Sequence, residues 1–223
     1  MTDLTSREQL TIPGPAGALE AVLDAPPAPL AAVVVCHPHP PDGGTMHHKV
    51  PMAIARVLVQ LGCAALRFNF RGVGQSEGAY DRGIGETEDA LAAAAWLRAR
   101  YPGLPLALAG FSFGGAVATV AASRLDPPPQ CLILAGTSPK RVGAPWVGVP
   151  TLIVHGERDE IVPLGDVLDW ARPQTLPVTV IPGAGHFFHG QLPLLQDLVR
   201  QFWLGTGIAT ASQDQGSEPP ASG

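Results

Sequence analysis

The chain contains 223 residues, of which 46% are hydrophobic and 15% are charged, so it can build a substantial core beneath a lightly charged surface. Asp and Glu number 19 against 14 Lys and Arg, and the resulting net charge of −5 argues against a nucleic-acid-binding protein, which needs a basic face. The longest apolar runs, such as residues 30–36 and 90–97, are too short to cross a bilayer, and residues 1–10 show no signal-peptide pattern.

Apolar segments alternate along the chain with turns rich in Gly and Pro, in an order typical of an α/β protein. Residues 10–12 and 19–23 flank a Pro-Gly-Pro-Ala-Gly turn and predict an opening hairpin. Six apolar runs then predict strands, at residues 31–36, 64–70, 106–111, 131–135, 152–155 and 178–181. Apolar residues recur with helical spacing between and after these runs, at 52–59, 90–97, 117–122, 167–170 and 194–203. Strands that are apolar at every position are covered on both faces, so we predict a mostly parallel sheet between two layers of helices.

The composition changes after Trp203. Residues 205–223 are rich in Gly, Ser, Thr, Ala, Gln and Pro, and Ile208 is their only residue from the group Leu, Ile, Val and Phe. Such a segment cannot bury enough apolar surface to order itself. We therefore predict one α/β domain over residues 1–204, followed by a disordered tail over residues 205–223.

The three cysteines, Cys36, Cys63 and Cys131, all stand among apolar neighbours. This pattern is better explained by buried free thiols in a reducing compartment than by a disulfide framework, which needs pairs. Together with apolar runs too short to span a membrane, it predicts a cytoplasmic protein.

A Gly-x-Ser-x-Gly motif stands at residues 110–114, directly after an apolar run and directly before an Ala- and Val-rich helix. A serine on such a sharp strand-to-helix turn is held in a strained conformation, and the flanking glycines, Gly110 and Gly114, let the backbones pass. The turn also puts Ser112 at the positive end of a helix, where developing negative charge is stabilised. The alternative is a packing turn whose serine only caps the helix.

A serine hydroxyl becomes a good nucleophile only beside a base that a third group orients. In a doubly wound sheet, such partners come from loops at the carboxyl ends of later strands. Asp159 follows the fifth of the six predicted runs and His186 follows the sixth, so the chain order is serine, acid, histidine. Three alternatives stay open: His186 is an ordinary loop histidine, Asp159 is a helix cap, or the acid is Glu157 or Glu160.

Acyl transfer also needs hydrogen-bond donors aimed at the oxyanion. One predicted donor is the backbone N–H of Phe113, directly after the serine. The second is expected from the loop after the first parallel strand, residues 36–46, which contains three prolines that carry no N–H. In the first part of this loop only His37 and His39 keep a donor, and since His37 stands at the strand end we choose His39.

Four motifs form a specific set when they are taken together. They are His-Pro-His-Pro…Gly-Gly-Thr-Met at residues 37–46, Arg-Phe-Asn-Phe-Arg-Gly-Val-Gly-x-Ser at 67–76, Gly-Phe-Ser-Phe-Gly at 110–114 and His-Phe-Phe-His at 186–189. With these motifs, residues 30–204 resemble the α/β-hydrolase superfamily, and within it a small, cap-less group similar to dienelactone hydrolases and esterases. The resemblance implies an eight-stranded, mostly parallel sheet with an antiparallel second strand, no substantial lid, a Ser–Asp–His triad and esterase-like hydrolysis. The usual His-Gly start of the oxyanion loop is replaced here by His37-Pro38.

Seven histidines also suggest a metal site, above all the pair His186 and His189. A zinc site needs three or four ligands, and His186 already has a role as the base. We therefore predict no metal, and we expect His189 to form part of the site wall or to hydrogen-bond a backbone carbonyl.

Polar residues after the second predicted parallel strand have both a functional and a structural interpretation. For Arg67 and Asn69 we favour the structural interpretation, in which their buried side chains tie loop carbonyls together, and not the functional one, in which they border the substrate. A cluster of acidic residues is expected to complement a helix N-terminus rather than to bind a cation: Glu86, Glu88 and Asp89.

These observations predict a carboxylesterase-like serine hydrolase that cleaves small esters through an acyl-enzyme, with Ser112 as nucleophile, His186 as base and Asp159 as orienting acid. A thioesterase or an acyltransferase would use the same triad. A non-catalytic binding protein on this fold is a further alternative.

The connection over residues 136–150 is too short for a helical lid, so we expect an open site for short acyl chains. Its apolar lining is predicted to include Met46, Phe187 and Phe188. No cofactor is expected. The expected partner is a small-molecule ester rather than a nucleic acid or a membrane, and the protein is expected to be a monomer or a small homo-oligomer.

Overall fold

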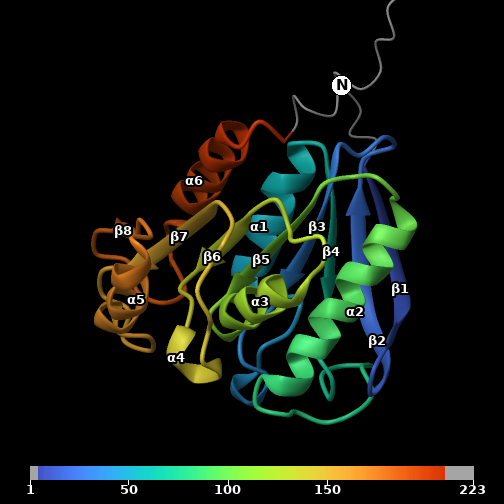
Figure 1. Ribbon diagram of the computed structural model, residues 1–223, viewed down its shortest axis with the longest axis horizontal. Helices are drawn as coiled ribbons and strands as arrows, with labels where there is room; N and C mark the ends of the chain where they lie inside the picture. The colour runs from blue at the N-terminus through green and yellow to red at the C-terminus, as the bar shows by residue number, and fades with distance from the viewer. Residues whose placement is uncertain (1–4, 209–223) are drawn as a thin grey trace, which may run out of the picture.

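Residues 5–208 are described by the computed structural model, and their strands join into one eight-stranded sheet in the order β1-β2-β4-β3-β5-β6-β7-β8 (Figure 1). The strands are β1 (Ser6–Gly14), β2 (Gly17–Ala25), β3 (Ala31–Cys36), β4 (Cys63–Phe68), β5 (Leu106–Phe111), β6 (Leu132–Ala135), β7 (Thr151–Gly156) and β8 (Thr179–Ile181). β2 pairs antiparallel with both β1 and β4, and all other neighbours are parallel. The expected mostly parallel sheet with an antiparallel second strand is confirmed.

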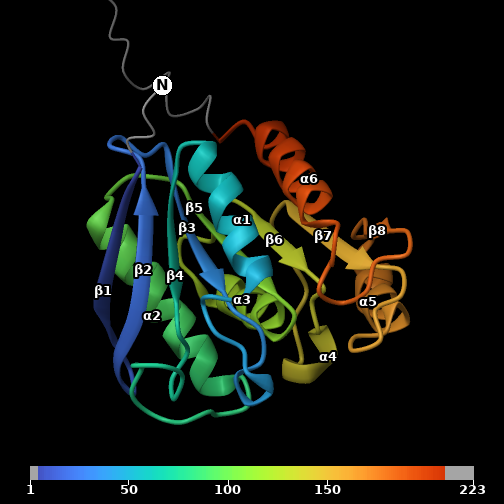
Figure 2. The same ribbon diagram turned by 180° about the vertical axis from the view of Figure 1, so that it is seen from behind.

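Helices cover both faces of the sheet. α1 (Lys49–Gln60) and α6 (Leu192–Gly205) pack on one face, which Figure 2 shows in front. α2 (Ile84–Arg100), α3 (Phe113–Arg124) and α5 (Leu164–Ala171) pack on the other face, while the one-turn α4 (Pro139–Val142) contacts α3 and α5. Two 3-10 turns, η1 (Pro40–Asp42) and η2 (Arg172–Gln174), complete the elements. The α/β architecture predicted from the alternating pattern is therefore the observed one.

The two faces of the sheet have separate cores, which explains why the strands are apolar at every position. In β3, Val34 and Cys36 belong to the core beneath α2 and α3, whereas Val33 and Val35 belong to the core beneath α1 and α6. Successive side chains of a strand point to opposite faces, so a strand covered on both sides needs apolar residues throughout.

The predicted strand at 64–70 ends two residues early, at Phe68. The reason lies in the side chain of His37, whose Nε2 accepts a hydrogen bond of 3.0 Å from the backbone N–H of Phe70. This donor is thereby taken away from a strand ladder, and the chain turns into the loop that leads to α2.

The predicted tail begins too early at residue 205. Gly205 still belongs to α6, and Ile208 is only 6% exposed within the core beneath α1 and α6. The rest of the predicted tail, residues 209–223, lies outside the described residues. All three cysteines are buried and free, as predicted. Across residues 5–208, the helices are too short or too polar to span a membrane.

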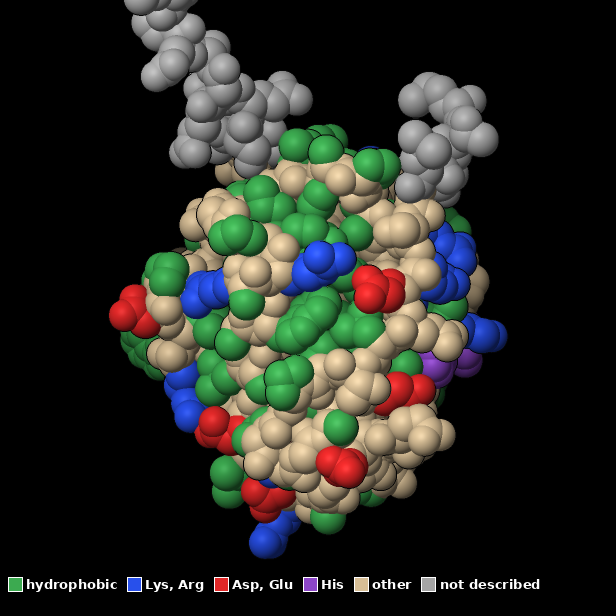
Figure 3. Space-filling view, turned by 90° about the vertical axis from the view of Figure 1, so that its right-hand side faces the viewer, with side chains coloured by type: hydrophobic (Ala, Val, Ile, Leu, Met, Phe, Trp, Pro, Cys, Tyr) green, Lys and Arg blue, Asp and Glu red, His purple; other side chains and the backbone are tan. Residues whose placement is uncertain are grey.

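The hairpin strand β1 forms one edge of the sheet, and most of its residues are exposed. Figure 3 views the molecule from this side, where hydrophobic side chains gather between charged side chains of both signs. The opposite edge is the short β8, and the carboxyl ends of β5, β7 and β8 bring the predicted catalytic loops to one end of the sheet.

Candidate active site

Ser112 occupies the sharp turn between β5 and α3. Its backbone has φ 56° and ψ −121°, a region that non-glycine residues rarely adopt and that stores strain. The turn requires small neighbours, because a Cβ on Gly110 would collide with the backbone of Gly114, and one on Gly114 would collide with the carbonyls of Cys36 and His37. The Ser112 side chain makes no capping hydrogen bond to α3, so the interpretation of this serine as a mere helix cap is not supported.

Asp159 and His186 meet at the same end of the sheet. The Oδ2 atom of Asp159 lies 2.7 Å from Nδ1 of His186, and the exposed fractions of the two side chains are 0% and 3%. The other oxygen, Oδ1, accepts hydrogen bonds from the backbone N–H groups of Ile161 and Val162, at 3.0 and 2.8 Å. Burial alone would raise the pKa of Asp159, but the hydrogen bonds from His186 and the two N–H groups outweigh it and lower the pKa below the ordinary value. The carboxylate is therefore held charged against the imidazole.

The two rival acids have other partners. Glu157 accepts a hydrogen bond of 2.7 Å from the backbone N–H of Gly183, while Glu160 lies next to Gly185. The structure thus brings Asp159, and neither glutamate, to the imidazole of His186.

The imidazole of His186 lies beside the turn that carries Ser112. It packs on the ring of Phe111, the residue directly before Ser112, with ring centroids 4.8 Å apart. A Cβ added to Gly136 would lie 3.4 Å from the His186 ring, and the residue before this glycine, Ala135, accepts a hydrogen bond of 2.9 Å from the Ser112 N–H. Ser112 and His186 line one cavity of about 210 Å³, which is open to solvent on one side.

A second histidine, His155, lies behind Asp159. Its Nε2 is 2.9 Å from the carbonyl oxygen of Val162 and 3.3 Å from Oδ2 of Asp159. Because both neighbours are acceptors, Nε2 carries the proton and donates toward both. His155 is fully buried, and burial lowers its pKa, so the ring is neutral. The sequence did not reveal that His155 donates toward Asp159, because His155 stands near the end of an apolar strand and its spacing matches no catalytic motif.

Of the two predicted oxyanion donors, His39 lines the cavity, and Phe113 directly follows Ser112, which also lines it. Phe113 begins α3, where the first N–H groups of a helix lack intrahelical partners. His39 lines the cavity, and its backbone carbonyl closes the tight turn by accepting from Asp42 and Gly44, at 3.1 and 3.0 Å. The His39 ring is itself fixed between Asp42 and Tyr80, each at 2.8 Å.

His37 anchors the start of this loop. Its Nδ1 donates to the carbonyl oxygen of Pro38 at 2.6 Å, and its Nε2 accepts from Phe70. Burial lowers its pKa to about 3, so the ring stays neutral and can accept at one nitrogen while donating at the other. The proline at position 38, unusual in the motif, is thus held by the histidine before it.

Of the three residues predicted for the apolar lining, one lies at the cavity and two lie elsewhere. Phe187 lines the cavity. Met46 is buried, its N–H is bound to Asn69 and its carbonyl to Arg67, and it lines a different cavity beside β1 and β2. Phe188 is fully buried in the core beneath α1 and α6. The walls that the sequence did not reveal come from the loop after Asp159 and from α4: Ile161, Val162, Pro163, Pro139, Lys140 and Arg141.

His48 forms another part of the wall, beside His186. Its ring stacks on Phe111 at 5.3 Å and lies 5.5 Å from Phe187. Burial, together with the neighbouring side chains of His186, Lys49 and His189, lowers the pKa of His48, so this imidazole is biased toward the neutral form.

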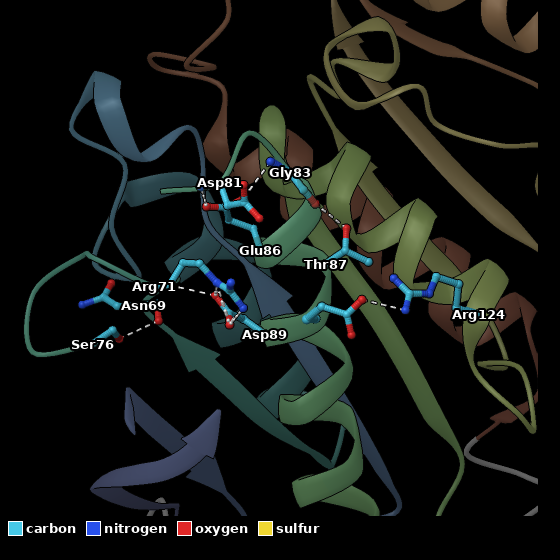
Figure 4. Close-up of polar contacts among 10 residues, drawn as sticks. Asn69, Arg71, Ser76, Asp81, Gly83, Glu86, Thr87, Asp89 and Arg124 are labelled. Carbon is cyan, nitrogen blue, oxygen red and sulfur yellow. Dashed lines mark hydrogen bonds and ion pairs between the residues drawn. The ribbon is translucent and has the colours of Figure 1, made fainter. Parts of the chain in front are cut away.

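The loop and helix after β4 hold the neighbourhood of the site in place (Figure 4). Arg67 and Asn69 bind the backbone of Met46, as predicted. Glu86 accepts from the N–H groups of Asp81 and Gly83 and so satisfies the start of α2. The expectation for the other two acidic residues is wrong, because each pairs with an arginine: Asp89 with Arg71 at 2.7 Å and Glu88 with Arg124 at 2.6 Å. Within residues 5–208, no cluster of three or more His, Cys, Asp or Glu side chains is placed to hold a metal ion.

Comparison with known proteins identifies the family. Residues 27–141 match the serine aminopeptidase S33 family. An uncharacterised protein of Rickettsia prowazekii is 36% identical over 200 residues, which cover 81% of this chain and 82% of that protein. Two solved structures are similar over most of their length. A lid-less α/β serine hydrolase from Xanthomonas campestris is 37% identical with a TM-score of 0.83, over 92% of this chain and 96% of its own.

An α/β serine hydrolase homologue from Coxiella burnetii is 38% identical with a TM-score of 0.80, over 90% of this chain and 98% of its own. These matches agree with the eight-stranded, mostly parallel sheet of this chain. The chain belongs to the serine aminopeptidase S33 family, within the α/β-hydrolase superfamily of serine hydrolases.

Proposed function

We propose that the protein is a carboxylesterase-like serine hydrolase that cleaves small esters with Ser112, His186 and Asp159 as its catalytic triad. The observation that carries this proposal is the 2.7 Å hydrogen bond between Asp159 and His186, next to a strained serine turn on the same cavity. A charged acid, an oriented imidazole and an accessible serine are the three parts that nucleophilic acyl transfer requires.

The reaction follows from the position of the protons. Asp159 holds Nδ1–H of His186, which leaves Nε2 free to accept the hydroxyl proton as Ser112 attacks the ester carbonyl. The oxyanion is stabilised by the N–H of Phe113 at the positive end of α3, and by the N–H of His39. His186 then returns its proton to the leaving alcohol. Water, deprotonated by the same imidazole, hydrolyses the acyl-enzyme.

The cavity favours small and uncharged acyl groups. Its volume of about 210 Å³ is small, and its apolar walls include Ile161, Val162 and Phe187. Two cations stand at its rim, but each is paired with a carboxylate: Lys140 with Asp166 at 2.6 Å, and Arg141 with Asp42 at 3.6 Å. Because these charges offset one another, the rim gives no strong preference for a charged acyl chain.

The test is steady-state hydrolysis of a series of p-nitrophenyl esters from acetate to dodecanoate, with a p-nitroanilide and a thioester of the best acyl group alongside. We expect the highest kcat/KM for short acyl oxygen esters, and no turnover by the folded Ser112→Ala variant. A preference for long chains, for the anilide or for the thioester would contradict the assignment of substrate. Turnover by the Ser112→Ala variant would contradict the mechanism.

A further inference from the structure

A second cavity lies on the face of the sheet that α1 covers only in part. Its volume is about 440 Å³, and its walls come from α1 and the strands β1, β2 and β4. Figure 2 shows the strands β1 and β2 uncovered beside α1 on this face. This cavity shares no lining residue with the cavity of Ser112 and His186.

Arginines dominate the walls of this second cavity. Arg7, Arg56 and Arg67 line it together with a single carboxylate, that of Asp24, so the wall carries a net charge of +2. This concentration is notable in a chain with a net charge of −5 and only 14 Lys and Arg residues. Asp24 is already shared between Arg7 at 2.6 Å and Arg67 at 2.9 Å, so among residues 5–208 the lining of this cavity keeps a positive excess.

Two of the arginines keep unused hydrogen-bond donors. The side chain of Arg67 is 4% exposed, and its buried Nε has no partner among the described residues, although its other nitrogens bind Asp24 and the Met46 carbonyl. Arg56 projects from α1, and over residues 5–208 its guanidinium forms no ion pair. A buried donor without a partner costs free energy, so a ligand that supplied an acceptor here would be favoured.

We propose that this cavity binds a small soluble molecule that carries a phosphate monoester. Guanidinium groups present paired N–H donors that match phosphate oxygens, and three arginines line this one cavity. The cavity is larger than a phosphate alone requires, and its remaining walls include the apolar side chains of Met52 and Val59. These side chains would contact the organic part of the ligand.

The test is calorimetric titration of the full chain with phenyl phosphate and with inorganic phosphate. We expect both to bind, phenyl phosphate more tightly, and Arg56→Ala to weaken phenyl phosphate binding by about tenfold or more. The matched control is Arg141→Ala, which removes the same charge at the rim of the catalytic cavity. The affinity of this variant for phenyl phosphate should stay within about twofold of that of the unchanged protein, because Arg141 lies outside the proposed site.

Several results would overturn the proposal. One is the absence of heat with either phosphate at millimolar concentration. A second is an equal loss of affinity in the two variants, which would show that the phosphate is attracted to positive charge in general. A third is a loss of affinity only in Arg141→Ala, which would place the anion beside Ser112. A phosphate headgroup offers the same chemistry on a membrane. The soluble ligand would therefore also be refuted if the protein sedimented with phosphatidic acid vesicles in a manner that depends on Arg56 but did not bind phenyl phosphate.

Discussion

Asp159 holds the imidazole of His186 by a 2.7 Å hydrogen bond from Nδ1, and both side chains are almost completely buried. Since a carboxylate only accepts, this bond selects the tautomer with the proton on Nδ1 and leaves Nε2 to act as the base. The same carboxylate is fixed by the backbone N–H groups of Ile161 and Val162, so the orientation of the imidazole depends on the loop after β7.

Asp159→Asn is expected to lower kcat for the best ester by about 10³ to 10⁴-fold, because the amide can donate to Nδ1 and stabilise the wrong tautomer. The fold should survive, since the asparagine oxygen can still accept from the two backbone N–H groups. Glu160→Gln is the matched control and should keep nearly full activity. Equal activity of the two variants would show that Asp159 is not the orienting acid.

His155→Leu is expected to lower kcat by about tenfold with KM unchanged, because the Asp159 carboxylate loses a donor at 3.3 Å. His155→Gln keeps an N–H donor and should recover most of this loss. Steady-state kinetics on the same ester distinguishes kcat from KM. If the His155→Leu variant is less stable but has the same kcat as the unchanged protein, His155 only supports the fold.

The glycine before the serine turn is required by packing. Gly110→Ala is expected to cost about 2 kcal/mol or more of unfolding free energy, because the added Cβ meets the backbone of Gly114 and Gly115. Gly148→Ala adds the same atom where nothing lies within 4 Å, and should change stability little. Urea unfolding of both variants measures the difference, and equal stabilities would show that the turn tolerates a side chain at residue 110.

The buried ion pair of Asp24 with Arg67 predicts a specific pH dependence. Burial alone would raise the pKa of Asp24, but hydrogen bonds from Arg7 and Arg67 outweigh it and bring the pKa below its ordinary value of 3.8. A carboxylate with a lowered native pKa stabilises the fold above its unfolded pKa, and that contribution is lost as the pH falls through the native pKa. Asp24→Asn should therefore cost about 3 kcal/mol at neutral pH.

This cost should shrink as the pH of the unfolding measurement falls below the ordinary carboxyl pKa of 3.8 and through the lowered native pKa, where the carboxylate of the unchanged protein takes up its proton. Asp169→Asn, which breaks an exposed pair with Arg172, should cost no more than about 0.5 kcal/mol at any pH. A cost of Asp24→Asn that is independent of pH would contradict the lowered pKa.

Much of the fold could be predicted because its signals are local. Each apolar run became a strand, since a strand between two helix layers must be apolar at every position. The serine turn was predictable as well, because the close approach of the backbones at positions 110 and 114 leaves no room for a Cβ and so requires glycine. The end of β4 was not, since it depends on a hydrogen bond between Phe70 and the ring of His37, 33 positions away in the chain.

The lining of the cavity was harder to predict than the meeting of Asp159 and His186 beside it. Asp159 and His186 are marked by their order after particular strands, whereas Met46 and Phe188 are apolar residues near the site whose direction depends on loop packing. The roles of His155 and of the arginine-lined cavity arise from contacts between distant elements, and no spacing in the sequence records them.

The central claim is that Ser112 is the nucleophile and that His186 activates it. It is tested most directly by the rate and position of covalent labelling with a fluorophosphonate, followed by intact-protein mass spectrometry and peptide mapping. We predict one adduct, on Ser112, and a labelling rate that falls by at least about 10³-fold in the His186→Ala variant. An adduct on another residue, or unchanged labelling in that variant, would contradict the account.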